Sequence, residues 1–371
     1  MQFIDLGKQQ SLIKDSLDAR IQDVLAHGKY IMGPEVKELE AQLAEYVGVK
    51  YCVSCSSGTD ALLMPLMAWD VGPGDAIFTT PFTFIASAEV IQLLGATPVF
   101  VDIDPQTYNI SPELLDDAIK QVIDAGELNP KAIIPVDLFG LPADYAAIEL
   151  ISKKYGIKIL EDGAQGFGGK IDDRRACSFG DVASTSFFPA KPLGCYGDGG
   201  AVFTNDDELY EKLISIRVHG KGGDKYDNIR VGINGRIDTL QAAIVLEKFT
   251  LFPNEIELRN QVAAQYNALL SDRVVVPETK DGYTSAWAQY SVLARDADDR
   301  AYLQSKLKDA GIPSAVYYPK PLHQQTAFSH LNYQAGDFPV SEEMSQRIFS
   351  LPMYPYLETA DIETICGVIT S

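Results

Sequence analysis

One lysine of the sequence has neighbours that could change its chemistry. Lys191 follows an apolar, β-branched run, and no charged residue lies within six positions on either side of it. Most lysines are solvated surface cations, but burial beside Phe187, Phe188, Leu193 and Tyr196 would disfavour the ammonium form and lower its pKa. A partly neutral lysine is a nucleophile suited to forming a Schiff base. We therefore expect covalent chemistry at Lys191.

A carboxylate and an amide follow the strand predicted at Lys158–Leu160. Glu161 and Asp162 come directly after it, and Gln165 lies three residues further on. Two carboxylates at a strand end often belong to a solvated loop. A carboxylate that faces a pyridine nitrogen, however, keeps that nitrogen protonated and makes the ring an electron sink. Asp162 could have this role, and Gln165 could then donate a hydrogen bond to a ring hydroxyl.

Two further loops could bind other parts of the same ligand. Ser57, Gly58 and Thr59 open a predicted helix, and the free N–H groups and partial positive charge of a helix N-terminus suit a phosphate. Phe84 follows another strand end, where an aromatic ring could stack on a flat heterocycle. Each signal is weak alone, because helix capping explains Ser57 and core packing explains Phe84.

The order of these features on successive strands is more specific than any one of them. A phosphate cradle at Gly58, an aromatic ring at Phe84, a carboxylate at Asp162 and a buried Lys191 follow one another along the chain. Together they predict a pyridoxal 5′-phosphate site, with Lys191 as the Schiff-base residue and Ser186 as a further phosphate ligand. No strand is followed by a GxGxxG motif, which disfavours a nicotinamide cofactor.

A basic loop lies beyond the lysine strand. Residues 217–230 contain several glycines together with Lys221 and Lys225. In a chain of net charge −20 this local excess of positive charge could bind a diphosphate, although a solvated hairpin explains it as well.

Strand and helix patterns alternate through the first two thirds of the chain. The predicted strands are Tyr51–Cys55, Ala76–Thr80, Thr97–Val101, Ala132–Val136, Lys158–Leu160, Val182–Ser186 and Ala201–Thr204. The predicted helices are 8–27, Glu35–Tyr46, 59–69, 83–94, 112–125, 144–155 and 206–217. This alternation indicates an α/β fold with a mostly parallel central sheet covered by helices. Ligands bind beyond the carboxyl ends of such strands, where the residues named above lie.

The pattern changes after about residue 250, where longer helices replace the alternation. The predicted elements are helices at Leu251–Leu270, Ala301–Ala310, 341–350 and 360–369, and a strand at Gln289–Leu293. We therefore expect a large α/β domain at residues 1–250 and a smaller C-terminal α+β domain at residues 251–371.

Composition limits the partners and the compartment. A net charge of −20 and a pI of about 4.6 make nucleic acid and anionic membranes poor partners. No signal peptide or membrane span is visible, and the five cysteines form no dense framework, which favours reduced thiols in a cytoplasm. The four histidines are scattered, so we predict no metal site.

Motifs along nearly the whole chain resemble one family. They are Phe3–Leu6, Gly33–Glu35, Ser57–Leu62, Thr83–Ser87, Glu161–Gln165, Ser186–Gly200, Asn234–Ala243, Tyr317–Pro319, Pro321–His323 and Ser350–Met353. The combination is similar to that of the DegT or StrS family of sugar aminotransferases, which are pyridoxal-phosphate enzymes of fold type I.

The resemblance implies a role for each matching residue. Lys191 matches the Schiff-base lysine, and Asp162 matches the partner of the pyridine nitrogen. The other cofactor contacts that it implies are Gly58, Thr59, Phe84, Gln165, Ser186 and Asn234. Asn234 matches a phosphate contact from a second subunit, so the resemblance implies a homodimer with shared active sites. On the substrate side it implies Arg236, Tyr317, Tyr318 and His323.

Within the family, the segment Ser186–Gly200 resembles enzymes that act on UDP-2-acetamido-2-deoxy-3-oxo-glucuronate, a precursor of bacterial surface polysaccharides. Many other members have Lys-Asn where this chain has Lys191-Pro192. The uronate-acting relatives have a histidine where this chain has Tyr317. The resemblance therefore implies amination of a UDP-linked keto-sugar at C3, with L-glutamate as the amino donor.

Four other functions are compatible with parts of the pattern. The substrate could be another nucleotide-linked 3-keto- or 4-keto-sugar. Some family members dehydrate sugars, but they have histidine in place of the lysine. An oxidoreductase would share the α/β fold but would need the missing glycine motif. A regulatory protein that keeps the fold is disfavoured by the complete set of cofactor residues.

Overall fold

The computed structural model describes residues 1–224 and 226–371. Lys225 of the predicted diphosphate loop lies outside these residues. The centre of the molecule is a seven-stranded sheet with the strand order β1-β9-β8-β5-β4-β2-β3. Its strands are β1 (Tyr51–Cys55), β2 (Asp75–Thr79), β3 (Thr97–Phe100), β4 (Asn129–Ile133), β5 (Lys158–Asp162), β8 (Val182–Ser186) and β9 (Gly200–Thr204).

All strands of this sheet except β9 run in one direction. β9 pairs antiparallel with both β8 and β1, whereas β5 pairs parallel with β8. No helix separates β8 from β9, so the segment between them turns back at the carboxyl edge of the sheet. Gly200, the first residue of β9, lies opposite both Cys55 and Ser186. The Lys191 loop is therefore next to the ends of β1 and β8.

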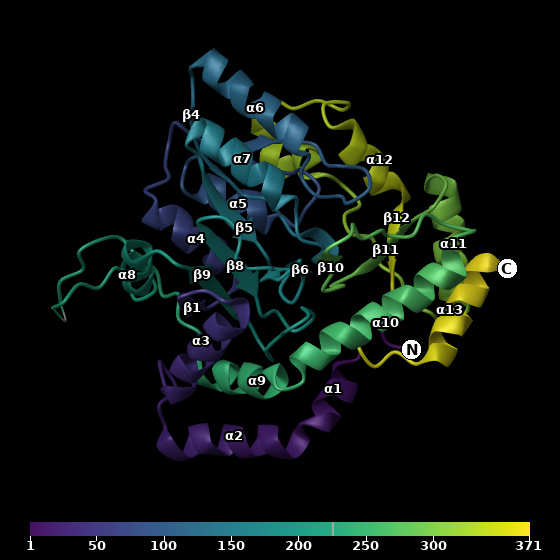
Figure 1. Cartoon of the computed structure of the whole chain (residues 1–371), viewed down its shortest axis with the longest axis horizontal. Helices are drawn as coiled ribbons and strands as arrows, with labels where there is room; N and C mark the ends of the chain where they lie inside the picture. Colours follow the sequence, from purple (N-terminus) through teal and green to yellow (C-terminus); the bar gives the residue numbers. More distant parts are fainter. Residues whose placement is uncertain (225) are drawn as a thin grey trace.

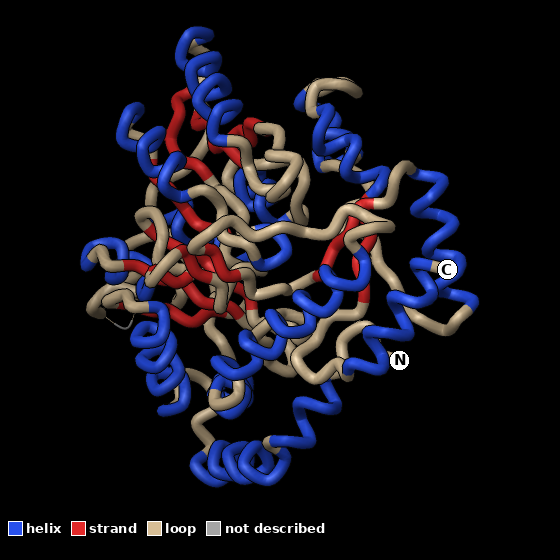
Figure 2. The backbone as a smooth tube through the Cα atoms, turned by 45° about the vertical axis from the view of Figure 1, so that its right-hand side comes forward, coloured by secondary structure: helices blue, strands red, loops and turns tan. Residues whose placement is uncertain are grey.

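Helices cover both faces of the sheet, as Figures 1 and 2 show. Alternating strand residues point to opposite faces; Ile77 packs with one set of helices and Phe78 with another. The first face is covered by α4 (Gly58–Ala68), α5 (Ala86–Leu93) and α8 (Asp207–Ile216). The second is covered by α3 (Pro34–Val47), α6 (Pro112–Ala125), α7 (Tyr145–Tyr155) and α9 (Thr239–Phe249). The sequence prediction of an α/β fold with a mostly parallel sheet is confirmed.

The N-terminal helix predicted at residues 8–27 is wrong as a single element. It consists of α1 (Leu6–Leu12) and α2 (Lys14–His27). The break is at Ile13, whose φ of −119° and ψ of 15° are not helical and whose side chain is buried. Burial of this apolar side chain against the core outweighs the continuous helical pattern. The predicted end at Gly28 is confirmed, because Gly28 adopts the left-handed conformation that ends a helix.

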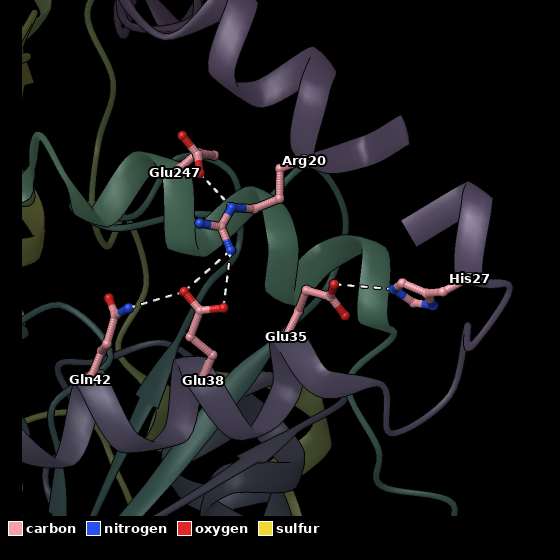
Figure 3. Close-up of polar contacts among 6 residues, drawn as sticks. All are labelled: Arg20, His27, Glu35, Glu38, Gln42 and Glu247. Atoms are coloured by element: carbon pink, nitrogen blue, oxygen red, sulfur yellow. Dashed lines mark hydrogen bonds and ion pairs between the residues drawn. The ribbon is translucent and has the colours of Figure 1, made fainter. Parts of the chain in front are cut away.

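A charged network joins α2, α3 and α9 on the outside of the molecule. Figure 3 shows Arg20 between Glu38 and Glu247, and His27 beside Glu35. The Arg20 Nη1 atom lies 3.1 Å from a carboxylate oxygen of Glu38, and its Nε atom donates to Glu247. The His27 Nε2 atom lies 3.1 Å from Glu35. These pairs attach the N-terminal helices to the helices that cover the sheet.

The C-terminal part forms its own apolar core around a two-stranded antiparallel sheet of β11 (Tyr290–Leu293) and β12 (Ile348–Leu351). The helices around it are α10 (Phe252–Leu270), α11 (Ala297–Asp309), α12 (Pro339–Arg347) and α13 (Thr359–Thr370). The helix predicted at 341–350 is wrong at its end, because residues 348–350 belong to β12. Pairing with β11 buries these residues and overrides their helical pattern.

Shorter elements complete the structure. A small sheet contains β6 (Lys170–Ile171), β7 (Arg174–Arg175) and β10 (Tyr283–Thr284). The 3-10 helices are η1 (Leu138–Gly140), η2 (Leu322–Gln324) and η3 (Thr326–Leu331). Within the described ranges, no helix has the length and apolar character needed to cross a membrane.

Helix α10 links the two parts of the chain, as its diagonal course in Figure 1 shows. Phe252 and Ile256 in its first turns pack in the core of α3 and α9, whereas Val262 and Tyr266 pack in the C-terminal core. A domain boundary near residue 250 remains a prediction. Helix α10 contributes residues to both cores.

Candidate active site

A cavity of about 430 Å³ lies at the carboxyl edge of the central sheet. Its lining comes from the loops after β1, β2, β5 and β8, from the C-terminal part and from the N-terminus. The lining residues are Phe3, Ile4, Ser57, Gly58, Thr59, Leu62, Thr83, Phe84, Ala86, Ser87, Asp162, Ala164, Gln165, Ser186, Phe188, Ala190, Lys191, Asp198, Gln289, Tyr317 and Tyr318. Nine of the twelve predicted site residues are therefore brought together in one place.

Lys191 lies in the β8–β9 connection and faces this cavity. Its backbone N–H donates to the Phe188 carbonyl at 2.8 Å, which closes a tight turn before the lysine. Burial of its amine lowers the pKa of Lys191, and the nearby Asp162 carboxylate opposes this shift. The neutral amine, which is the nucleophilic form, is therefore more accessible here than in an ordinary lysine.

Asp162 ends β5, and its side chain is 4% exposed. One carboxylate oxygen accepts a hydrogen bond from Ser87 Oγ at 2.7 Å, and the other accepts from the Ala164 N–H at 3.2 Å. Desolvation raises the pKa of Asp162 despite these bonds. No ion pair compensates this carboxylate in the described chain, so it is suited to a ligand that presents a positive N–H group.

The first turn of α4 and the end of β8 form a small polar cradle. Ser57 caps the helix, because its Oγ accepts from the Asp60 N–H at 3.0 Å. The N–H groups of Gly58 and Thr59 make no hydrogen bond within the described chain. A Cβ atom at Gly58 would lie 2.5 Å from the Cβ of Ser186. Glycine is therefore required for this close approach, which leaves N–H and hydroxyl groups available to an anion.

The orientation of Gln165 is fixed by two hydrogen bonds. Its Oε1 atom accepts from the Phe139 N–H at 2.8 Å, and its Nε2 atom lies 3.1 Å from the Tyr318 hydroxyl. Gln165 therefore presents its donor group toward Tyr318. Phe84 lines the same cavity with 54% of its surface exposed, so one ring face is available for stacking.

Three of the predicted residues lie outside the cavity lining. Asn234 is exposed and bridges to Val218, and Arg236 is half-buried with no hydrogen-bond partner for its Nε among the described residues. His323 is only 3% exposed, and its Nε2 atom lies 3.0 Å from Glu342. Burial lowers the pKa of His323. His323 is therefore buried in this chain, and its role on the substrate side stays a prediction.

Several lining residues have no role in the sequence prediction. Phe3 lies beside Tyr317, with ring centroids 6.5 Å apart, and Gln289 has a buried Oε1 without a partner among the described residues. Ser87 donates to Asp162. The position of Ser87 one helical turn after Thr83 is a signal that could have identified it. Phe3 and Gln289 are distant in sequence from the other lining residues, so local patterns could not place them.

The observed arrangement fits pyridoxal phosphate on two independent features. The buried Asp162 forms no ion pair in the described chain, although Lys191 is near it, and the glycine cradle at Gly58 has free donors. Asp162, Gly58 and Lys191 all line the same cavity, so one ligand can contact all three. The described residues contain no group of three or more His, Cys, Asp or Glu that could hold a metal ion.

Comparisons with known proteins agree with this chemistry. The model of the DegT/DnrJ/EryC1/StrS aminotransferase family matches residues 11–370. A UDP-2-acetamido-2-deoxy-3-oxo-D-glucuronate aminotransferase of Pseudomonas aeruginosa is 50% identical, and the match covers 100% of both chains. A pleiotropic regulatory protein of Geobacillus stearothermophilus is 42% identical over 96% of this chain and 94% of its own.

Solved structures of similar proteins have the same fold. A DegT/DnrJ/EryC1/StrS aminotransferase from Brucella abortus is 54% identical, with a TM-score of 0.97 and coverage of 100% of this chain and 98% of that chain. NtdA from Bacillus subtilis, solved with its bound cofactor PMP, is 29% identical, with a TM-score of 0.88 and coverage of 100% and 83%. The chain therefore belongs to the DegT/DnrJ/EryC1/StrS aminotransferase family and is a pyridoxal-phosphate-dependent aminotransferase.

Proposed function

We propose that this chain transfers the amino group of L-glutamate to C3 of UDP-2-acetamido-2-deoxy-3-oxo-glucuronate, in the cytoplasm, for the synthesis of a bacterial surface polysaccharide such as O-antigen. The observation that carries this proposal is the 50% identity over the full length of the Pseudomonas aeruginosa enzyme that is named for this substrate. The cavity supports it, because its volume of about 430 Å³ can hold a cofactor and part of a sugar.

We assign the cofactor contacts as follows. Asp162 holds the proton on the ring nitrogen, Gln165 orients the ring, and Phe84 stacks on its face. Gly58, Thr59 and Ser186 bind the phosphate at the start of α4. Bound pyridoxal phosphate supplies an electron sink for the reaction.

Lys191 is the proposed general base. Its neutral amine removes the proton from the α-carbon of glutamate and, in the second half-reaction, delivers a proton to C3 of the sugar. Burial lowers the pKa of the amine, which favours this proton exchange. Tyr317 and Tyr318 line the same cavity, and we assign them to the sugar side.

The sugar carboxylate needs a positively charged partner, and Lys191 is the one basic side chain among the described residues that line the cavity. We assign this contact to Arg236, because its planar guanidinium suits a carboxylate and its Nε has no partner among the described residues. Arg236 lies outside the cavity of its own chain, as does the exposed Asn234. Both positions support a homodimer in which Asn234 of one protomer binds the phosphate in the other.

Product analysis tests the proposed substrate. The purified protein should convert the UDP-linked 3-amino uronate and 2-oxoglutarate into the 3-keto sugar and glutamate, which mass spectrometry of both products detects. Activity on a 4-amino sugar and none on the 3-amino uronate would contradict the choice of C3. It would favour the alternative of another nucleotide-linked keto-sugar.

A mixture of two inactive variants tests the shared active site. Lys191→Ala and Asn234→Ala protomers, unfolded together and refolded, should regain roughly a quarter of the wild-type activity. Each mixed dimer then has one site with both residues intact. Absence of any regained activity, while mixed dimers are present by mass, would show that Asn234 acts within its own protomer.

A regulatory role is the second candidate, and the match to a pleiotropic regulatory protein favours it. The buried Lys191 and Asp162 side chains favour catalysis instead, because a regulator has no need of a desolvated lysine. Bound cofactor together with no amino transfer from any nucleotide-linked amino sugar would support the regulatory role.

A further inference from the structure

Two carboxyl groups lie beneath the turn that carries the cofactor contacts Asp162 and Gln165. Asp137 and Glu161 are both completely buried, with 0% of their surface exposed. Glu161 directly precedes Asp162 on β5, so its side chain points to the other face of the sheet. Asp137 follows β4, and its backbone N–H donates to the Asp162 carbonyl at 3.0 Å.

Backbone donors hold Glu161 from one side. One of its carboxylate oxygens accepts from the Cys177 N–H, and the other accepts from the Phe179 N–H at 2.8 Å. Both donors belong to the segment after β7, and neither carries a charge. Glu161 is therefore fixed in place but not neutralised by these contacts.

Asp137 is held in a similar way, but at only one of its two oxygens. Its Oδ1 atom accepts from the Tyr145 hydroxyl at 2.8 Å and from the Ala143 N–H at 3.0 Å. Its Oδ2 atom has no N–H or hydroxyl partner among the described residues. Besides Tyr145, the Glu161 carboxyl interacts with Asp137 through a side-chain hydrogen bond.

The turn between Asp162 and Gly166 packs against the Asp137 and Glu161 carboxyl groups. A Cβ atom at Gly166 would lie 2.4 Å from the Asp137 Oδ2 atom, and one at Gly163 would lie 3.6 Å from the Glu161 Oε1 atom. Glycine is therefore required at position 166 for the turn to lie against the Asp137 carboxyl, whereas at position 163 the close neighbour of a Cβ atom is the Cys177 Sγ atom at 2.6 Å and the Glu161 carboxyl is in ordinary contact. A change in the spacing of the carboxyl groups would move the turn.

No cation among the described residues forms an ion pair with either group. The residues that face them are Tyr145 from α7, Cys177 from the segment after β7, Asp162 on β5 and, beyond Asp137, Tyr283 of β10. Burial raises the pKa of the Tyr145 hydroxyl and of the Cys177 thiol, so both stay neutral. The charge of the Lys191 amine interacts with Asp162 rather than with Asp137 or Glu161.

Two adjacent buried carboxyl groups cannot both be ionised without a large electrostatic penalty. Burial raises the pKa of Asp137 to about 7, and burial together with Asp137 raises the pKa of Glu161 well above its ordinary value. The proton belongs to the pair rather than to one residue. A protonated carboxyl also supplies the donor that the Asp137 Oδ2 atom lacks.

We propose that Asp137 and Glu161 share one proton and that this carboxyl pair positions the turn carrying Asp162 and Gln165. The proposal rests on the cofactor roles assigned to those two residues. Asp137 and Glu161 touch neither cofactor nor substrate, so they are positioning residues. Loss of the shared proton would separate the two carboxylates and displace Asp162 from the ring nitrogen.

Two substitutions that keep the branching of the side chain separate the proton from the shape. In Asp137→Asn, the amide nitrogen donates permanently to Glu161, while the amide oxygen still accepts from Tyr145 and Ala143. Asp137→Leu has the same number of side-chain heavy atoms, although its methyl groups are larger, and it leaves Glu161 without this donor. The Asn variant should therefore preserve the turn, and the Leu variant should not.

The affinity for pyridoxamine 5′-phosphate reports whether the turn is correctly positioned, and its measurement does not require catalysis. This compound has no aldehyde, so it forms no bond with Lys191. For the full-length protein at pH 6, Asp137→Asn should bind it within about threefold of wild type, and Asp137→Leu about tenfold or more weakly. Between pH 6 and 9 the affinity of wild type should fall more steeply than that of Asp137→Asn. Equal pH profiles for wild type and Asp137→Asn would overturn the proposal.

Unfolding in urea and infrared spectroscopy provide readouts that need no cofactor. Because the folded pair holds a proton that the unfolded chain releases, its stabilisation decreases as pH rises from about 4 toward 7. This decrease should be smaller in Asp137→Asn. The carbonyl stretch of a buried protonated carboxyl should be present in wild type at pH 6 and reduced in Asp137→Asn. Its absence from wild type would refute the shared proton even if both variants failed to fold.

These readouts are independent of the sugar. A protein that fails to aminate any keto-sugar would still show the infrared band and the contrast between the two variants. Conversely, an active aminotransferase without the band would retain its proposed function and lose only the carboxyl pair.

Discussion

Acidic residues are arranged in opposite ways in two regions of the molecule. On the outer face shown in Figure 3, Glu38 and Glu247 share the guanidinium of Arg20, and Glu35 lies beside His27. At the carboxyl edge of the sheet, no cation forms an ion pair with Asp162 in the described chain. The same residue type is thus neutralised in one region and left uncompensated in the other.

The difference has a physical cause. On the outer face Arg20 and Glu38 are partly solvated, and the buried Glu247 has the Arg20 guanidinium as its compensating charge. A buried carboxylate without a cation destabilises the fold, and Asp162 remains buried although this raises its pKa. Such a group is expected where a ligand brings the missing positive charge. The contrast separates charges that attach helices from the charge that we propose for cofactor binding, and it can be tested by substitution.

The largest expected effect is at Lys191. Lys191→Ala should reduce turnover by about 10³-fold or more and remove the visible absorbance of cofactor bonded to the lysine, because both the nucleophile and the proton carrier are lost. Steady-state kinetics and an absorbance spectrum of the purified protein measure the two effects.

Lys248 offers a matched control for this substitution. It is also a buried lysine, with its pKa lowered to about 8 by burial, but it lies on α9 over the Tyr196 ring and outside the cavity lining. Lys248→Met should keep the visible absorbance. Loss of the absorbance in Lys248→Met but not in Lys191→Ala would reverse the assignment.

Asp162→Asn should have the next largest effect. Turnover should fall roughly 10²–10³-fold, because the neutral amide no longer holds the proton on the ring nitrogen. The cofactor-free variant should be at least as stable as cofactor-free wild type at pH 7. The reason is that a buried carboxylate with a raised pKa stabilises the fold below about pH 4 and loses that contribution as pH rises through the folded value.

Thermal unfolding with and without cofactor measures the stability of wild type and Asp162→Asn in both states. The cofactor should raise the unfolding temperature of wild type more than that of Asp162→Asn. Equal stabilisation of both proteins would show that Asp162 does not act on the ring.

Gly58→Ala should weaken cofactor binding without touching a charge. The added Cβ would lie 2.5 Å from the Cβ of Ser186, so the phosphate cradle must open, with a loss of about 1–3 kcal/mol of stability. The equilibrium dissociation constant of pyridoxal phosphate measures the effect of this opening on cofactor binding. Gly367→Ala is the control, because no atom lies within 4 Å of a Cβ there and the helical site should tolerate alanine. Equal affinity in Gly58→Ala and wild type would rule out the cradle.

The smallest effect on turnover is expected on the outer face. Arg20→Ala should leave turnover unchanged and lower the free energy of unfolding by about 1–3 kcal/mol. The pair with the partly solvated Glu38 contributes little, whereas the buried Glu247 loses its compensating charge. Urea unfolding and steady-state kinetics check both statements. A tenfold loss of turnover in Arg20→Ala would mean that the outer face and the cavity are coupled, and the contrast between them would fail.

Most of the fold could be predicted because strands and helices of an α/β domain have distinct periodicities. β1 and β8 have the predicted bounds, and α6 coincides with the predicted helix at 112–125. The errors occur where tertiary contacts override a local pattern. Ile13 is buried between two helices, and β12 pairs with β11, which is distant in sequence.

The site residues in the loops after the strands could also be predicted. Parallel strands bring their carboxyl ends, and therefore these loops, to one edge of the sheet. Lys191, Asp162 and Gly58 meet there. Contacts from distant segments could not be predicted. Phe3 and Gln289 reach the cavity only because the N-terminus and the C-terminal part fold against the sheet.

The sequence by itself determined the chemistry of the Lys191 loop, because a lysine among aromatic and apolar residues, with an acid and a glycine-rich helix start on neighbouring strands, has few other uses. Only the tertiary structure decided how those groups are charged. Ionisation depends on burial and on neighbours from other elements. These neighbours leave Asp162 buried without an ion pair, bring Asp137 against Glu161, and bury His323 beneath the surface.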